Sequence, residues 1–204
     1  MADDFPRPLP VQLPGSRLAR WVFEAVGWSI QFDGLPSRQG VMVVYPHTSN
    51  WDFVYLLIAK WTVGMQLRFW AKDSLFRWPL LGRWMQWLGG VPVDRRSPHG
   101  IVGQMVRTIQ QCREEDGYFW LALTPEGTRK WTPGWRSGFY QVALGANVPV
   151  GICSVNYRER RVYVSHFYHL TGDVQADMER IANAFQGAVG KHHAQAAPIQ
   201  IMEK

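Results

Sequence analysis

The segment from His47 to Asp52 carries an imidazole and a carboxylate five positions apart. An imidazole backed by a carboxylate is a general-base pair that can take a proton from an alcohol. The pair follows an apolar, β-branched run at 41–45, which predicts a buried strand, and it precedes a helix predicted at 51–59. Because strand ends that lead into helices often hold catalytic groups in α/β folds, this pair is the first candidate site.

The same segment has a second interpretation. Ser49 and Asp52 have the spacing of a capping box, in which the serine caps a helix and the acid occupies its third position. Asp52 would then only start the helix, and His47 would be an ordinary polar residue at a strand end. The two interpretations can coexist, because a helix start fixes Asp52 in space and lets it orient the ring of His47.

Three further blocks combine apolar runs with polar ends. A run at 119–123 predicts a second buried strand and ends at Thr124-Pro125-Glu126-Gly127-Thr128-Arg129. The block 89–96 is a short apolar strand followed by one acid and two arginines. The block Val148-Pro149-Val150 opens a strand predicted at 150–155.

The order and spacing of the four blocks resembles the glycerol-phosphate acyltransferase superfamily, the 1-acyl-glycerol-3-phosphate acyltransferase-like proteins. The matches are His47 and Asp52 to its H-x-x-x-x-D motif, Gly90 and Arg95 to its second motif, Pro125 to Arg129 to its P-E-G-T-R motif, and Val148 to Val150 to its fourth. The resemblance covers about residues 41–155. Departures at Pro46, Thr124 and Gly151 indicate a side branch of the family.

The resemblance implies acyl transfer from a thioester donor, acyl-CoA or acyl-carrier protein, to a hydroxyl of a lysophospholipid-like acceptor such as 1-acyl-glycerol-3-phosphate. His47 would be the general base and Asp52 would hold its tautomer, with no protein nucleophile needed. The implied acceptor-binding residues are Arg95, Glu126, Gly127, Thr128 and Arg129, with Glu126 holding Arg129 or a glycerol hydroxyl. No cofactor and no metal site are expected.

Two other functions stay open at this stage. The same chemistry could act on a different acceptor, such as a lyso-aminolipid or another specialised lipid, and water as acceptor would give thioester hydrolysis. A non-catalytic membrane-surface binding protein on the same scaffold is an alternative of another class. The presence of His47, Asp52, Glu126 and Arg129 argues against that alternative.

Composition limits the partners. The chain has 204 residues, 22 Lys+Arg against 16 Asp+Glu, and a net charge of +6, which favours acidic lipid surfaces, phosphates, coenzyme A or an acidic carrier protein. The basic residues are scattered and no nucleic-acid motif is present, so nucleic acid is not expected. Without a secretory signal or an apolar run of about 20 residues, we expect a cytoplasmic protein, peripheral at the inner face of the cell membrane.

The chain contains eleven tryptophans, an unusually large number for its length. Two stretches, Arg17–Ser29 and Phe69–Leu88, combine tryptophans with basic residues. Tryptophan favours membrane–water interfaces, and the first stretch predicts an amphipathic helix with Leu18, Trp21 and Val22 on its apolar face. Both stretches are therefore interpreted as membrane contacts, with packing on the sheet as the alternative.

Alternating strand and helix patterns predict a single α/β domain with a mixed β-sheet flanked by helices. Its predicted parts are a lead-in and amphipathic helix at 1–30, an acyltransferase domain at 31–190 and a poorly ordered tail at 191–204. Residues 1–15 are expected to be loose. Other predicted helices lie at 101–114, 139–145 and 173–189, and other predicted strands at 66–71, 90–93 and 162–167.

Overall fold

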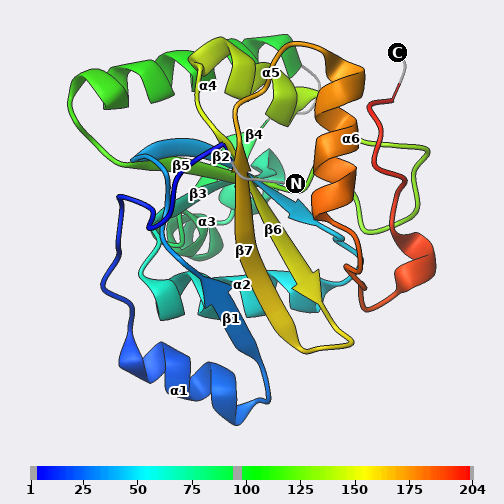
Figure 1. The fold of residues 1–204 in the computed structure, drawn as a ribbon. Coiled ribbons are helices and arrows are strands. Elements are labelled where there is room, and N and C mark those ends of the chain that lie inside the picture. The colour runs from blue at the N-terminus through cyan, green and yellow to red at the C-terminus, as the bar shows by residue number, and fades with distance from the viewer. Residues whose placement is uncertain (1–3, 94–97, 203–204) are drawn as a thin grey trace.

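A computed structural model describes residues 4–93 and 98–202. Figure 1 shows a central sheet with helices on both faces. Its strands are β1 (Ser29–Phe32), β2 (Gln39–Tyr45), β3 (Leu67–Lys72), β4 (Gly90–Val93), β5 (Phe119–Leu123), β6 (Val150–Asn156) and β7 (Arg161–Tyr168). The α-helices are α1 (Arg17–Ala25), α2 (Asn50–Val63), α3 (Pro79–Trp87), α4 (Pro98–Glu114), α5 (Gly138–Ala146) and α6 (Val174–Ala184), and the 3₁₀ turns are η1 (Asp73–Phe76) and η2 (His193–Gln195).

The sheet has seven strands in the order β1-β7-β6-β2-β5-β3-β4. All neighbours are parallel except β6 and β7, which form an antiparallel pair. The predicted mixed α/β fold is therefore confirmed. Because β2 lies between β5 and β6 and runs parallel to both, the carboxyl ends of these three strands meet at one edge of the sheet.

Side chains of β2 alternate between two cores, as the pleat of a strand requires. Val41 and Val43 pack on the face covered by α4, α5 and α6, whereas Met42 and Val44 pack on the face covered by α1 and α2. Figure 1 shows these two helical layers on opposite sides of the sheet. This burial on both faces explains why β2 is apolar at every position from 41 to 44.

Helix α2 has well-defined ends. Ser49 and Asp52 form the predicted capping box, and the helix ends at Gly64, whose φ of 75° is in the left-handed region. The helix is four residues longer than the predicted 51–59 at its carboxyl end. Lys60 does not stop it, because its Nζ donates to the carbonyl of Leu88 at 2.6 Å.

Several predicted boundaries were wrong. The first helix was expected to continue to Ser29, but it ends at Ala25, and residues 29–32 form β1, a strand that was not predicted. Gly27, with a φ of +76°, makes the turn between them. Helix α4 begins at Pro98, three residues before the predicted start at 101, and α6 ends five residues before the predicted Val189.

Both terminal segments pack on the domain, so the expectation that they are loose was wrong. Near the amino end, Leu9 is fully buried and Val11 pairs with Leu35 in an antiparallel bridge. Near the carboxyl end, Ala197 is buried and Ile201 forms a parallel bridge with Trp135. Backbone hydrogen bonds in these two bridges hold the segments against the domain. The sequence did not indicate them, because neither segment has a periodic apolar pattern.

The two tryptophan-rich stretches are largely exposed. On α1, Leu18 is 71% exposed and Trp21 is 66% exposed, while Phe23 faces the core. On and around α3, the exposed apolar side chains are Leu75, Trp78, Leu80, Leu81, Trp84 and Trp87. The alternative that these side chains simply pack on the sheet is therefore wrong for most of them, although Trp28 and Met85 are buried.

Candidate active site

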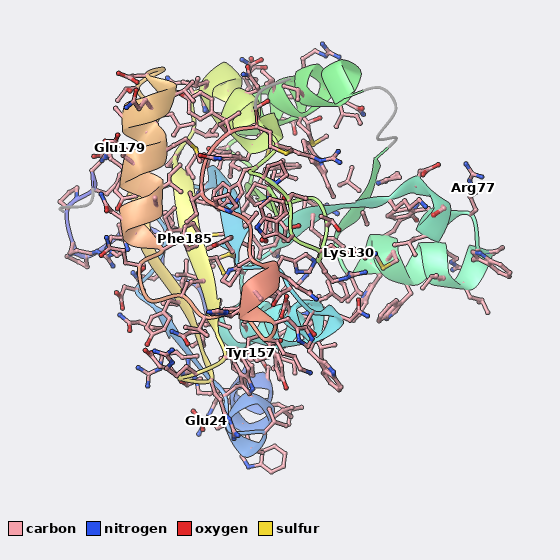
Figure 2. The ribbon with its side chains drawn as sticks, turned by 90° about the vertical axis from the view of Figure 1, so that its right-hand side faces the viewer. Glu24, Arg77, Lys130, Tyr157, Glu179 and Phe185 are labelled. Carbon is pink, nitrogen blue, oxygen red and sulfur yellow. The ribbon has the colours of Figure 1, made fainter. Side chains whose placement is uncertain are left out.

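Three strand ends bring the candidate residues together. His47 follows β2, Glu126 follows β5 and Tyr157 follows β6. Contacts between these segments are direct, because the Glu126 carboxylate accepts a hydrogen bond from the backbone N–H of His47 at 2.6 Å. The parallel order of the strands therefore creates the site, and Figure 2 views the molecule from this side, with Tyr157 labelled.

The His47 ring pairs with Asp52 as the spacing predicted. Nδ1 of His47 lies 3.1 Å from Oδ2 of Asp52, whose side chain is completely buried. An ionised carboxylate only accepts, so Nδ1 carries the proton and Nε2 is left with a lone pair. The capping-box and general-base interpretations coexist, since the same Oδ2 also accepts the N–H groups of Thr48 and Ser49 at 2.8 and 2.9 Å.

The environment keeps Asp52 ionised. Burial alone would raise its pKa, but hydrogen bonds from His47, from the hydroxyl of Tyr157 and from the Ser49 backbone outweigh burial and lower the pKa below its ordinary value. The carboxylate therefore stays negative near neutral pH. In this state it can orient His47 and stabilise the imidazolium that forms when the ring takes a proton.

Glu126 is buried and contacts two backbone groups. It is 1% exposed, and its two oxygens accept backbone N–H groups of His47 at 2.6 Å and of Ala197 at 3.1 Å. Its described contacts do not include Arg129. Burial raises the pKa of Glu126, and these two backbone hydrogen bonds oppose that rise. Glu126 therefore links two segments, the loop that carries His47 and the carboxyl-terminal segment.

The loop after Glu126 carries exposed, positively charged side chains. Gly127 has a φ of +68°, and a Cβ on it would lie 2.9 Å from Nε of Arg136, so glycine allows this arginine to pack across the loop. The Thr128 hydroxyl accepts the N–H of Lys130 at 3.3 Å, and Arg129 is exposed. Within the described residues, neither Arg129 nor Arg136 forms an ion pair, so both are available to an anion.

Arg136 was missed by the sequence analysis. Its backbone N–H donates to the carbonyl of Pro125 at 2.9 Å, which fixes it to the start of the P-E-G-T-R loop. The preceding Trp135 is fully buried and anchors the segment. No local pattern in the sequence distinguishes it from a solvated arginine.

The other two sequence blocks end at opposite edges of the sheet. Arg95, expected to bind the acceptor, lies outside the described residues, although β4 ends at Val93 on the same edge of the sheet as β2. The block Val148–Val150 lies at the opposite edge, because Val150 pairs with Val41 at the amino end of β2. The fourth block therefore aligns the strands and does not contact the candidate base.

The carboxyl-terminal segment, residues 190–202, passes along the site. The backbone N–H of His192 donates to the Thr48 hydroxyl at 3.1 Å, and Lys191 lies over the ring of Trp51 at 5.5 Å. The hydroxyl of Tyr45 donates to the carbonyl of Ala197 at 3.0 Å. These contacts explain why the segment is ordered, and they add basic groups next to His47.

His47 is one of the residues that line an apolar cavity of about 160 Å³. It follows α2, where Phe53, Leu56, Leu57 and Val63 line one side, and the sheet provides the other side. Lys60 of α2 also lines it. An apolar cavity of this kind can hold a hydrocarbon chain, and its contact with His47 brings the imidazole close to that chain.

In the described part of the chain, no group of three or more His, Cys, Asp or Glu side chains is arranged to hold a metal ion. Nor is any helix of the described residues both long enough and apolar enough to cross a membrane.

Comparison with known proteins places the chain in a family. The model of the family described as Acyltransferase matches residues 29–157. The chain is 31% identical over 124 residues to the Arabidopsis thaliana protein named "Probable 1-acyl-sn-glycerol-3-phosphate acyltransferase 5", covering 56% of this chain and 32% of that protein. It is 36% identical over 67 residues to the 1-acyl-sn-glycerol-3-phosphate acyltransferase of Streptococcus pneumoniae, covering 32% of this chain and 25% of that protein.

A solved structure has a similar fold. The match to the crystal structure of the 1-acyl-sn-glycerophosphate acyltransferase PlsC from Thermotoga maritima has a TM-score of 0.51 at 17% identity, over 85% of this chain and 78% of that chain. The chain thus spans about a third or less of the two curated relatives and most of the solved one. Since the family model matches well over half of the sequence, including the His47–Asp52 pair and the P-E-G-T-R loop, this chain belongs to the acyltransferase family.

Proposed function

We propose that this protein transfers a fatty acyl group from a thioester, acyl-CoA or acyl-carrier protein, to the hydroxyl of a lysophospholipid-like acceptor. 1-acyl-glycerol-3-phosphate is the first candidate acceptor, because the named relatives carry it in their names. The observation that carries the proposal is the His47–Asp52 pair, whose histidine lines an apolar cavity. A base in the lining of a hydrocarbon site brings an alcohol and an acyl carbon together.

The proposed reaction passes the acyl group from the thioester to the alcohol through a tetrahedral intermediate. Nε2 of His47 takes the proton of the acceptor hydroxyl while the alcohol oxygen bonds to the thioester carbon. Collapse of the tetrahedral intermediate breaks the carbon–sulfur bond, and the imidazolium returns its proton to the leaving thiolate. Asp52 keeps Nδ1 protonated throughout, and no covalent intermediate on the protein is required.

The direct test is an acyl-transfer assay on the full chain with acyl-CoA and with acyl-carrier protein. The acceptors compared are 1-acyl-glycerol-3-phosphate, a lyso-aminolipid and water. We expect the lysophosphatidate to give a diacyl product by mass spectrometry at the highest kcat/KM. A lyso-aminolipid preference would change the acceptor, free fatty acid alone would indicate a hydrolase, and no turnover of any thioester would contradict the proposal.

We propose that Arg129 and Arg136 bind the anionic group of the acceptor, since both lie on the loop after Glu126 and have no ion-pair partner among the described residues. A guanidinium binds two phosphate oxygens at once, and an ammonium does not. Arg129→Lys should therefore raise the KM for the acceptor by about tenfold, the equivalent of one charge-assisted hydrogen bond.

The measurement for Arg129→Lys is steady-state kinetics with acceptor and donor varied in turn. The matched control is Arg107→Lys, at an exposed arginine of α4 outside the P-E-G-T-R loop. This substitution should leave both KM values unchanged. A rise confined to the KM of the donor would assign Arg129 to the phosphates of the donor.

We also propose that the exposed apolar side chains of α1 and α3 contact a membrane surface, as a peripheral attachment at the inner face of the cell membrane. Leu18, Trp61 and Trp87 line one groove of about 830 Å³, so α1, the end of α2 and α3 share this face. Exposed arginines on the same elements, such as Arg20 and Arg83, favour anionic lipid.

Point substitutions test this attachment better than truncation, because residues 4–28 contribute to the core. Replacing Trp78 and Trp84 together by serine should weaken binding to anionic vesicles by about tenfold, since each indole loses apolar burial. Co-sedimentation at low and high salt measures the effect, with Val174→Ser on α6 as the control. Unchanged binding of the double variant would exclude α3 as a contact.

A further inference from the structure

The two oxygens of Asp52 have different partners. Oδ2 accepts from His47 and from the backbone N–H groups of Thr48 and Ser49. Oδ1 accepts from the hydroxyl of Tyr157 at 2.6 Å, the shortest of the hydrogen bonds to this carboxylate. Because the Asp52 side chain is fully buried, water does not replace this partner without a change in structure.

Tyr157 is itself held in place. Its backbone N–H donates to the carbonyl of Val189 at 2.8 Å. Its ring meets Trp28 edge-on, with centroids 5.0 Å apart, and approaches Tyr55 at 6.0 Å. Trp28 stacks on Tyr55 at 4.1 Å, so the phenol is enclosed by aromatic rings from two other segments. The position of its hydroxyl is therefore set by packing before any substrate binds.

The hydroxyl acts as a donor to Asp52, since an ionised carboxylate offers no hydrogen. Burial, followed by the charge and hydrogen bond of Asp52, raises the pKa of Tyr157, so the phenol stays protonated. A donor on Oδ1 has two consequences. It prevents rotation of the carboxylate, and it withdraws negative charge from the oxygen that faces His47.

We propose that Tyr157 is a positioning residue for the His47–Asp52 pair, holding the carboxylate with Oδ2 toward the ring and limiting how strongly it favours the imidazolium. This inference rests on the proposed function of His47 as general base. Nothing in the H-x-x-x-x-D or P-E-G-T-R blocks indicates Tyr157, which lies 105 positions beyond Asp52 and reaches it only because β6 neighbours β2.

The segments that border the pair in the described chain carry other titratable groups. These groups are Tyr45 of β2, Tyr55 of α2, Glu126 after β5, Arg129, Lys130 and Arg136 of the loop that follows Glu126, and Lys191 and His192 of the carboxyl-terminal segment. Glu126 is the buried anion among them, and it stays in place when Tyr157 is changed. Comparison of single variants therefore isolates the contribution of the Tyr157 hydroxyl.

The test is Tyr157→Phe, which removes one oxygen and keeps the ring. We expect kcat to fall by about tenfold with little change in either KM, the kinetic equivalent of one hydrogen bond to a charged group. The acid limb of the kcat/KM profile should move to higher pH, because an unshared carboxylate stabilises the protonated imidazole more strongly. A merely structural role would lower activity without moving this limb.

The control is Tyr118→Phe, the same chemical change at a buried hydroxyl that has no hydrogen-bond partner in the described structure. It should leave kcat and the acid limb unchanged. An NMR titration of the His47 ring, identified by its absence in His47→Ala, gives a readout that needs no turnover. A higher His47 pKa in Tyr157→Phe supports the inference. An unchanged or lower value overturns it, whereas absent turnover in the unmodified protein would overturn only the proposed function.

Discussion

His47→Ala should lower kcat by about 10²–10⁴-fold while the fold remains intact, because general-base catalysis contributes that much and no other described side chain can replace the ring. The ring is only 15% exposed, but its loss leaves the backbone contacts of the loop unchanged. Turnover of a thioester with 1-acyl-glycerol-3-phosphate measures the effect, and circular dichroism checks the fold.

The matched control for His47→Ala is His169→Ala. His169 is exposed and follows β7, which runs antiparallel to β6, so it lies at the opposite edge of the sheet. It should retain full activity. A folded His47→Ala protein with normal turnover would exclude the proposed mechanism, including the role of Asp52.

Glu126→Gln should lower the free energy of unfolding by about 2 kcal/mol and also reduce turnover, because a buried acceptor of two N–H groups becomes a donor on one side. Glutamine loses the contact to the N–H of His47 or the contact to the N–H of Ala197. The first loss releases the loop that carries His47, and the second releases the carboxyl-terminal segment. Denaturant unfolding gives the stability change. Hydrogen exchange should show loss of protection at residues 190–202.

The same carboxylate-to-amide change at the surface is the control for Glu126→Gln. Asp116 is 86% exposed and pairs with Arg38, so Asp116→Asn should alter stability by no more than about 0.5 kcal/mol. Equal stability of Glu126→Gln and the unmodified protein would contradict the positioning role of Glu126. A direct role in acceptor binding would instead change the KM of the acceptor and leave exchange at 190–202 unaltered.

The sequence by itself was sufficient for the α/β class, for most strands and helices, and for the His47–Asp52 pair. These features depend on local patterns. Apolar runs mark β2 and β5, and the spacing of Ser49 and Asp52 makes a capping box whose backbone bonds also aim the carboxylate at the ring. A pair five residues apart across a helix start is brought together by chain geometry alone.

Only the tertiary structure decided which distant groups complete this site. Tyr157 reaches the pair because β6 lies beside β2, and strand order leaves no local pattern in a sequence. Glu126 belongs to the P-E-G-T-R motif, but its hydrogen bond to the backbone of His47 depends on β5 lying on the other side of β2. The role of the carboxyl-terminal segment depends on backbone groups such as the N–H of Ala197, which every residue except proline possesses. A contact made by the backbone does not depend on a particular residue type, so it leaves no pattern in the sequence. For this reason the sequence predicted a loose tail, whereas the folded tail binds Thr48 and Glu126 beside the site.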